Sequence, residues 1–226
     1  MKKFCISFIM IFLSTVSFFS LAEADLLWSQ DPHGWGKLSA ATVSHSWPAD
    51  DFMLDTSSLI NQVSWWGGRG GDTPVVDGFY IRFFSDNYDA SADQHYADQL
   101  LFEEYISGDA DQTTYNSETY SYTASLSSTF DAAANERYWL SIQADSANDP
   151  NNPWWGWQVS DTANLDPAEY NNPSHSHYPI TNFWNGSRHD MAFELQGTPA
   201  PVPEPATLFL MASGLTGIVI MRKQKA

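Results

Sequence analysis

The chain has 226 residues and a formal net charge of −17 at pH 7, from 27 acidic and 10 basic residues. Residues 25–202 are more acidic still, because 25 of the carboxylates but only five of the basic residues fall within them (5 minus 25, or −20). A domain with this charge should repel nucleic acid, anionic lipid and acidic sugars, so none of these is an expected partner.

The first residues carry the features of a secretory signal peptide. Two lysines precede an apolar stretch at residues 4–19, and Ala-Glu-Ala at residues 22–24 supplies the small residues of a cleavage site. We therefore expect residues 1–24 to be removed on export. Cys5 is the single cysteine of the sequence and lies within this segment. Disulfides therefore cannot stabilise the mature chain, and the burial of its many aromatic side chains must do so.

Residues 25–197 are dominated by short runs in which apolar and polar residues alternate, and helical periodicity is almost absent. Turn-forming Gly, Asp, Asn and Pro residues separate eight such runs. Eight short strands in about 180 residues predict an all-β fold, an antiparallel two-sheet β-sandwich of the jelly-roll type. The predicted strands lie at residues 50–55, 59–66, 76–86, 100–107, 118–130, 137–145, 154–161 and 191–197.

The same alternation predicts which side chains form the core. Phe79, Ile81 and Phe83 share one face of a strand, and we expect that face to be buried. Trp139 and Ile142 are also predicted core residues, although their spacing of three prevents them from sharing one face of a regular strand. Long connections without a strand pattern are predicted to be loops, at residues 86–99, 108–116 and 161–188.

Tryptophans gather in two short segments, "SWWGG" and "PWWGW". Strand alternation places Trp155 and Trp157 on one face and sends Trp66 to the face opposite its neighbour Trp65. An exposed, flat aromatic ring can stack on the apolar face of a sugar, so Trp66, Trp155 and Trp157 are candidates for a glycan-binding platform. Tryptophan also packs in sandwich cores and under loops, and the sequence leaves both interpretations open.

One predicted loop combines several hard oxygen donors. Asp86, Asn87, Asp89 and Asp93 lie close together in the sequence, and calcium prefers carboxylate and carbonyl oxygens. The spacing differs from that of an EF-hand loop, which needs a glycine at its sixth position and a glutamate at its twelfth. The sequence therefore allows either a calcium site or an ordinary solvated acidic loop.

The usual catalytic signatures are missing from the sequence, including G-x-S-x-G, H-E-x-x-H and a phosphate-binding loop. Adjacent Glu103 and Glu104 would point to opposite faces of a strand, so they could not flank one glycosidic bond. We therefore expect a protein that is not an enzyme. The alternative is an extracellular glycan-active enzyme on a jelly-roll scaffold, which would need two carboxylates about 5 to 9 Å apart.

The end of the chain combines a proline-rich linker, an apolar run and positive charge. The linker, at residues 198–205, contains Pro203-Glu204-Pro205. Residues 206–221 carry no charge and would form a helix of about 24 Å, shorter than the hydrocarbon core of about 30 Å. The tail at residues 222–226 is basic and should stay in the cytoplasm, with the body of the protein outside. Its basic residues are Arg222, Lys223 and Lys225.

This arrangement, with Pro203-Glu204-Pro205 followed by a short hydrophobic helix and a basic end, resembles the PEP-CTERM sorting signal of Gram-negative bacteria. The resemblance covers residues 202–226. It implies recognition by an exosortase, a membrane-embedded cysteine protease, in a host that makes extracellular polysaccharide. Cleavage at or near the Pro-Glu-Pro segment would end a transient inner-membrane stage that faces the periplasm. Residues 65–86 and 136–142 also resemble a β-sandwich domain found beside such signals, which implies no activity.

With this resemblance, the sequence predicts an exported protein of the cell envelope or extracellular matrix. Its β-sandwich would be structural or would bind extracellular polysaccharide, and no cofactor other than calcium is suggested.

Overall fold

The computed structural model forms two antiparallel sheets, and it contains no helix among the residues that it describes. Within those ranges there is accordingly no helix of the length and apolar character needed to cross a membrane. The described residues do not include the predicted signal peptide at residues 1–24, except for Ala24. They also do not include the predicted membrane helix at residues 206–221. The described residues are 24–39, 47–68, 76–91, 93–108, 110–116, 119–145, 155–160, 169–172, 175–179 and 190–200.

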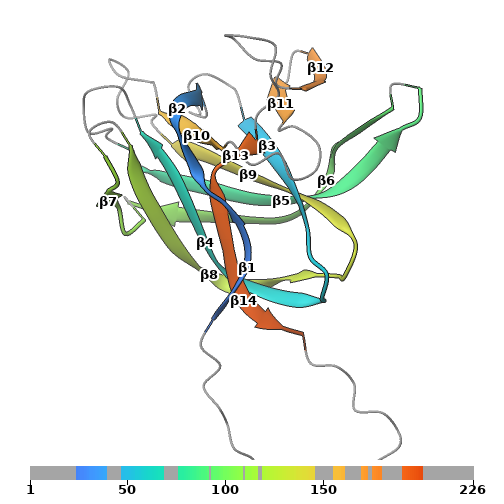
Figure 1. The fold of residues 1–226 in the computed structure, drawn as a ribbon, viewed down its shortest axis with the longest axis horizontal. Coiled ribbons are helices and arrows are strands. Elements are labelled where there is room, and N and C mark those ends of the chain that lie inside the picture. The colour runs from blue at the N-terminus through green and yellow to red at the C-terminus, as the bar shows by residue number, and fades with distance from the viewer. Residues whose placement is uncertain are drawn as a thin grey trace, which may run out of the picture.

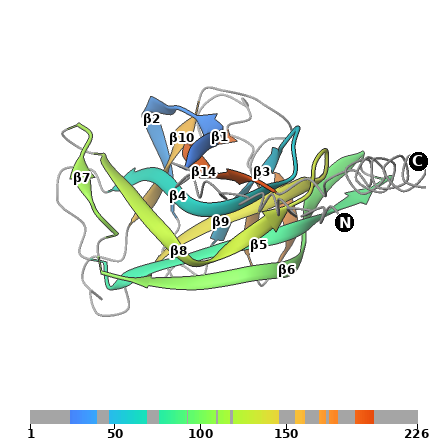
Figure 2. The ribbon, with the colours of Figure 1, turned by 90° about the horizontal axis from the view of Figure 1, so that it is seen from below.

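The two sheets form the two layers of a sandwich, with β5, β6 and β9 on one side and β1, β4 and β14 on the other (Figure 2). The eight-stranded sheet contains β1 (Asp25–Gln30), β2 (Pro32–Ser39), β4 (Ser58–Gly68), β7 (Thr113–Thr114), β8 (Tyr120–Ala132), β10 (Gly156–Ser160), β13 (Asp190–Met191) and β14 (Phe193–Pro199). The six-stranded sheet contains β3 (Trp47–Met53), β5 (Gly78–Asp89), β6 (Gln94–Ser107), β9 (Arg137–Asp145), β11 (Glu169–Asn172) and β12 (His175–Pro179).

The strand order is that of a jelly roll. Four strands of one layer run β1-β14-β4-β8, and four of the other run β3-β9-β5-β6. Along the chain these eight strands alternate between the layers, except at the β5–β6 hairpin, and the first and last strands are neighbours. The antiparallel β-sandwich predicted from the sequence is therefore confirmed, with the double Greek-key connectivity of this fold class.

Strand alternation selects the core as expected. Phe79, Ile81 and Phe83 of β5 are completely buried and belong to one hydrophobic cluster, which also contains Ile142 of β9. Trp139 is fully buried too, but its position three residues before Ile142 turns it to the opposite face of β9, outside that cluster. The prediction that Trp139 is buried is confirmed, and the structure places its side chain on the other face of the sheet from the central cluster.

Aromatic rings join the two layers of the sandwich. Phe83 of β5 stacks on Phe130 of β8 with ring centroids 4.3 Å apart and planes 3° from parallel. Phe79 of β5 meets Trp65 of β4 edge-on at 5.0 Å. Because these contacts cross between the sheets, aromatic packing performs the role that disulfides play in many exported domains.

The predicted loop at residues 86–99 is instead the end of a hairpin. β5 continues to Asp89 and β6 begins at Gln94, so most of this acidic segment is paired strand. The turn is held by Ser91, whose backbone N donates to Asp89 Oδ1 at 2.8 Å, and Asp93 adopts a positive φ of 52°. The hairpin tip is exposed, so its strands are polar and lack the apolar alternation from which strands were predicted. Two further strands, β11 and β12, lie in the predicted loop at 161–188.

Candidate functional site

The six-stranded sheet has a polar outer face. Residues that alternate with the core positions of β3, β5, β6 and β9 point away from the other sheet. We call this set the outer face. Its members are Asp51, Tyr80, Arg82, Phe84, Asp86, Glu103, Tyr105, Arg137, Trp139, Ser141 and Gln143.

Arg82 lies at the centre of one part of the outer face and is largely buried. Its Nε lies 2.5 Å from Glu103 Oε2, and its Nη1 donates to Gln143 Oε1 at 3.1 Å. The guanidinium carbon lies 4.7 Å from the centre of the Tyr80 ring. These contacts balance the arginine charge and fix the three neighbouring side chains in place.

Two tyrosines form an aromatic pair beside this arginine. Tyr80 of β5 and Tyr105 of β6 are cross-strand partners, and their ring centroids lie 4.9 Å apart. Tyr105 is 42% exposed, and its hydroxyl donates to Asp145 Oδ2 at 3.4 Å. Partial desolvation and then the nearby Asp145 charge raise the pKa of Tyr105, so its hydroxyl stays protonated and able to donate.

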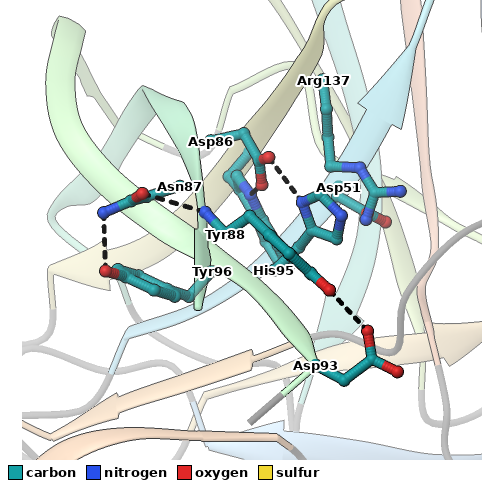
Figure 3. Close-up of polar contacts among 9 residues, drawn as sticks. Asp51, Asp86, Asn87, Tyr88, Asp93, His95, Tyr96 and Arg137 are labelled. Carbon is teal, nitrogen blue, oxygen red and sulfur yellow. Dashed lines mark hydrogen bonds and ion pairs between the residues drawn. The ribbon is translucent and has the colours of Figure 1, made fainter. Parts of the chain in front are cut away.

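A second polar group lies on the other part of the outer face (Figure 3). The Trp139 indole Nε1 donates to Asp86 Oδ1 at 2.9 Å, and His95 Nδ1 lies 2.6 Å from Asp86 Oδ2. Arg137 Nη1 forms an ion pair with the fully buried Asp51 Oδ2 at 2.9 Å. Each carboxylate therefore has a defined partner, which orients the histidine and the arginine on this face.

Ser141 lies between the two groups, beside Arg82 in the register of β5 and β9. Its side chain is 1% exposed, and its Oγ has no hydrogen-bond partner among the described residues. A buried hydroxyl without a partner is destabilising. Stability alone therefore does not account for a serine at the middle of the outer face.

The four candidate calcium ligands lie on the β5–β6 hairpin, and each side chain takes part in a hydrogen bond within the protein. Figure 3 shows three of them, Asp86, Asn87 and Asp93. Asp86 contacts Trp139 and His95, as described above. Within the described ranges, no three carboxylate, imidazole or thiol groups come together as a metal site. The bonds of the other three residues are Asn87 Nδ2 to Tyr96 Oη at 2.6 Å, Ser91 N to Asp89 Oδ1 at 2.8 Å and Tyr88 Oη to Asp93 Oδ1 at 2.7 Å.

The predicted tryptophan platform is wrong for two of its three residues. Trp155 and Trp157 are 2% and 0% exposed and belong to the hydrophobic core. The Trp155 ring packs directly against Gly67, where a Cβ would collide with it. The Trp157 Nε1 donates to the backbone oxygen of Ala192 at 2.9 Å, which satisfies its polar group without solvent.

Trp66, the third candidate, is half-buried and meets Tyr115 nearly edge-on, with ring centroids 6.3 Å apart. A role for Trp66 in glycan binding stays a prediction.

Sequence reasoning missed the tyrosine pair on the outer face. The alternation in β5 does place Tyr80 and Arg82 opposite the core residues. Tyr105 lies in the strand predicted at residues 100–107, but its pairing with Tyr80 depends on the register of the β5–β6 hairpin, which alternation alone does not give. The sequence pattern instead favoured the tryptophans as the glycan-binding residues.

The fold and the outer face define an acidic jelly-roll domain with a polar face that carries two tyrosines. Residues 26–196 match the family described as a domain of unknown function, DUF7901, and the chain belongs to this family. Residues 201–223 match the PEP-CTERM protein-sorting motif, so the predicted sorting signal is confirmed and the protein is an exosortase substrate. Among curated proteins, no relative matches the sequence.

Proposed function

We propose that this protein is a non-enzymatic component of the cell surface or extracellular matrix that binds extracellular polysaccharide through its jelly roll. The sorting motif carries the first part of the proposal, because it marks the chain for export through a membrane-anchored intermediate and for release by exosortase. The outer face supports the second part. It offers the exposed ring of Tyr105 and the half-exposed carboxylate of Glu103, which the buried Arg82 orients, and such a combination suits a hydroxyl-rich polymer.

The charge of the domain supports an extracellular, matrix-associated role. A net charge of −20 on residues 25–202 (5 minus 25) keeps the released domain soluble. The same charge disfavours nucleic acid and membrane surfaces as ligands. An uncharged polymer would experience no such repulsion.

A glycan-active enzyme is the alternative function. It would need two carboxylates about 5 to 9 Å apart next to a sugar-binding surface. Among the side chains that the structure describes, no tryptophan is exposed beside such a pair. Incubating the purified domain with the polysaccharide of its host and measuring new reducing ends tests this alternative directly. The proposal expects none, and steady release of reducing ends would contradict it.

Fractionation of the native host tests the proposed function. We expect the mature protein to sediment with extracellular polysaccharide in the wild-type strain and to be freely soluble in a strain that makes no polysaccharide. A strain without exosortase serves as the control, because there the protein should stay with the inner membrane. If the extracellular protein is equally soluble with and without polysaccharide, polysaccharide binding is not its function.

A further inference from the structure

The ring of Tyr105 lies over the backbone of the neighbouring strand. A Cβ added to Gly78 would lie 2.7 Å from both Cζ and the hydroxyl oxygen of Tyr105, so the phenol end occupies the space that a side chain on Gly78 would fill. Gly78 thus allows the ring to approach the sheet closely. Because the side chain is still 42% exposed, part of its apolar surface is open to solvent.

Contacts with two neighbouring side chains orient this ring before any ligand arrives. Tyr80 packs against it at 4.9 Å, and the hydroxyl is bonded to Asp145. A tyrosine has few rotatable bonds, so an ordered ring loses little entropy on binding. The Tyr105 ring is therefore a pre-organised flat surface, which is what stacking on a sugar ring needs.

Hydrogen-bonding groups flank the ring on the same face. Glu103 lies two residues before Tyr105 on β6, about 7 Å along the strand, and its side chain is 44% exposed. Arg82 holds this carboxylate in position, and Gln143 is bonded to the same arginine. Sugar hydroxyls can donate to such a carboxylate, while the ring receives the apolar face of the sugar.

The local charge selects the class of glycan. The positive charge of Arg82 is balanced by Glu103, and Asp145 adds a further carboxylate next to Tyr105. An acidic polysaccharide would bring its own carboxylates towards these groups and towards a strongly acidic domain. An uncharged polymer avoids that cost.

From these observations we propose that Tyr105, Tyr80 and Glu103 form a subsite for one sugar unit of a neutral polysaccharide. This inference rests on the proposed polysaccharide-binding function and adds its location and the class of its ligand.

Affinity electrophoresis tests the subsite. The extracellular polysaccharide of the native host is separated on an anion exchanger into a neutral and an acidic fraction, and each is cast into a native gel. We expect the neutral fraction to retard the wild-type domain and Tyr105→Phe to a similar extent. Tyr105→Ala should need about tenfold more polymer for the same retardation, which is typical of losing one important aromatic contact. Tyr88→Ala, which removes a comparably exposed tyrosine at the tip of the β5–β6 hairpin, should behave as wild type.

The outcomes separate the subsite from the function. If the neutral fraction retards wild type and Tyr105→Ala equally, the subsite is wrong although polysaccharide binding stands. If only the acidic fraction retards the wild type, the ligand class is wrong. If neither fraction retards it, polysaccharide binding itself fails.

A footprint on the wild-type domain avoids dependence on a folded variant. Tyrosine nitration followed by peptide mass analysis is carried out with and without the neutral fraction. We expect the polymer to protect Tyr105 and to leave Tyr88 unprotected, since both are exposed in the free domain. Equal nitration of Tyr105 in the presence and absence of a retarding polymer would overturn the subsite.

Discussion

Asp25, in the first strand, lies directly opposite Gly197, in the last strand. The chain therefore enters and leaves the jelly roll at the same end, where β1 begins and β14 ends (Figure 1). Ala200, the last described residue, still donates from its backbone N to the oxygen of Ser57 at 2.7 Å. The sorting motif follows this bond closely, so a short tether would hold the folded domain before release.

Removal of residues 25–30 should destabilise the domain. This deletion leaves β14 as an unpaired edge and removes Trp28, which packs against the core at Phe52. Because Trp28 is only partly buried, we take about 3 kcal/mol, the lower end for removing a tryptophan from a core, and this loss would lower the melting temperature by roughly 6 to 12 °C. Circular dichroism melts of the mature domain check this. A variant of the mature domain that ends at Ala200 is the control, and it should have the same melting temperature as the mature domain. An unchanged melting temperature after the deletion would show that β1 contributes little.

Phe83→Ala should cost about 3 to 5 kcal/mol of unfolding free energy. Phe83 is fully buried, stacks on Phe130 and meets Phe52 edge-on at 5.9 Å, so its loss opens a cavity between the sheets. Urea denaturation measures the change. Leu101→Ala, at an exposed position on β6, should change the free energy by less than about 0.5 kcal/mol. Similar costs for the two variants would refute the assignment of Phe83 to the core.

The two-sheet architecture was predictable because alternation and turn residues carry it. Phe79, Ile81 and Phe83 follow the period of two along a single strand, and the structure buries all three. The hairpin at residues 86–99 was not predictable in this way, since its exposed strands lack an apolar face and are defined by their pairing.

The candidate site was less predictable than the fold. Alternation correctly puts Trp155 and Trp157 on one face, but it does not predict whether that face is exposed to solvent or buried. The answer depends on which strand approaches Gly67, and that contact is distant in sequence. The sorting motif was readable because its residues are contiguous and act through order and charge.

A buried carboxyl group gives the stability a pH dependence. Asp50 is fully buried and accepts hydrogen bonds from the backbone N of Met191 at 2.6 Å and of Asp51 at 3.1 Å. The Gln30 amide also donates to Asp50 Oδ2 at 3.0 Å when its oxygen and nitrogen are assigned by the hydrogen bonds that they can make. Desolvation, and then the charges of Asp190 and Asp51, raise the pKa of Asp50 well above its ordinary value.

Asp50→Asn should therefore gain stability relative to wild type as the pH rises. In wild type, the pKa of Asp50 is higher in the folded state than in the unfolded state, where it is about 3.9. The stability that its protonated form contributes is therefore fully present below the unfolded-state pKa. It is lost as the pH rises through the folded-state pKa. The asparagine does not titrate. Between these two pKa values the difference in unfolding free energy should change by about 1.4 kcal/mol per pH unit in favour of the variant. Urea titrations from pH 3 to 8 check this, and a difference independent of pH would contradict it.

Calcium should leave the melting temperature unchanged. The side-chain oxygens of Asp89 and Asp93 accept hydrogen bonds from Ser91 and Tyr88 of the hairpin, and Asp86 accepts one from Trp139 of β9, so a cation would compete with these donors. A ligand that binds the folded state raises the melting temperature by mass action. Melts at millimolar calcium and with a chelator decide the matter. A rise that the chelator reverses and that Asp86→Asn abolishes would establish a calcium site on the hairpin.

Intact-mass analysis of the protein from its native host tests the central claim most directly. Release by exosortase predicts one extracellular species that begins at Asp25 and ends within or next to Pro203-Glu204-Pro205, without the residues beyond Ala206. In a strain lacking exosortase, the protein should keep its tail through Ala226 and fractionate with the inner membrane. Equal release of the same species from both strains would show that the sorting motif does not direct processing of this protein.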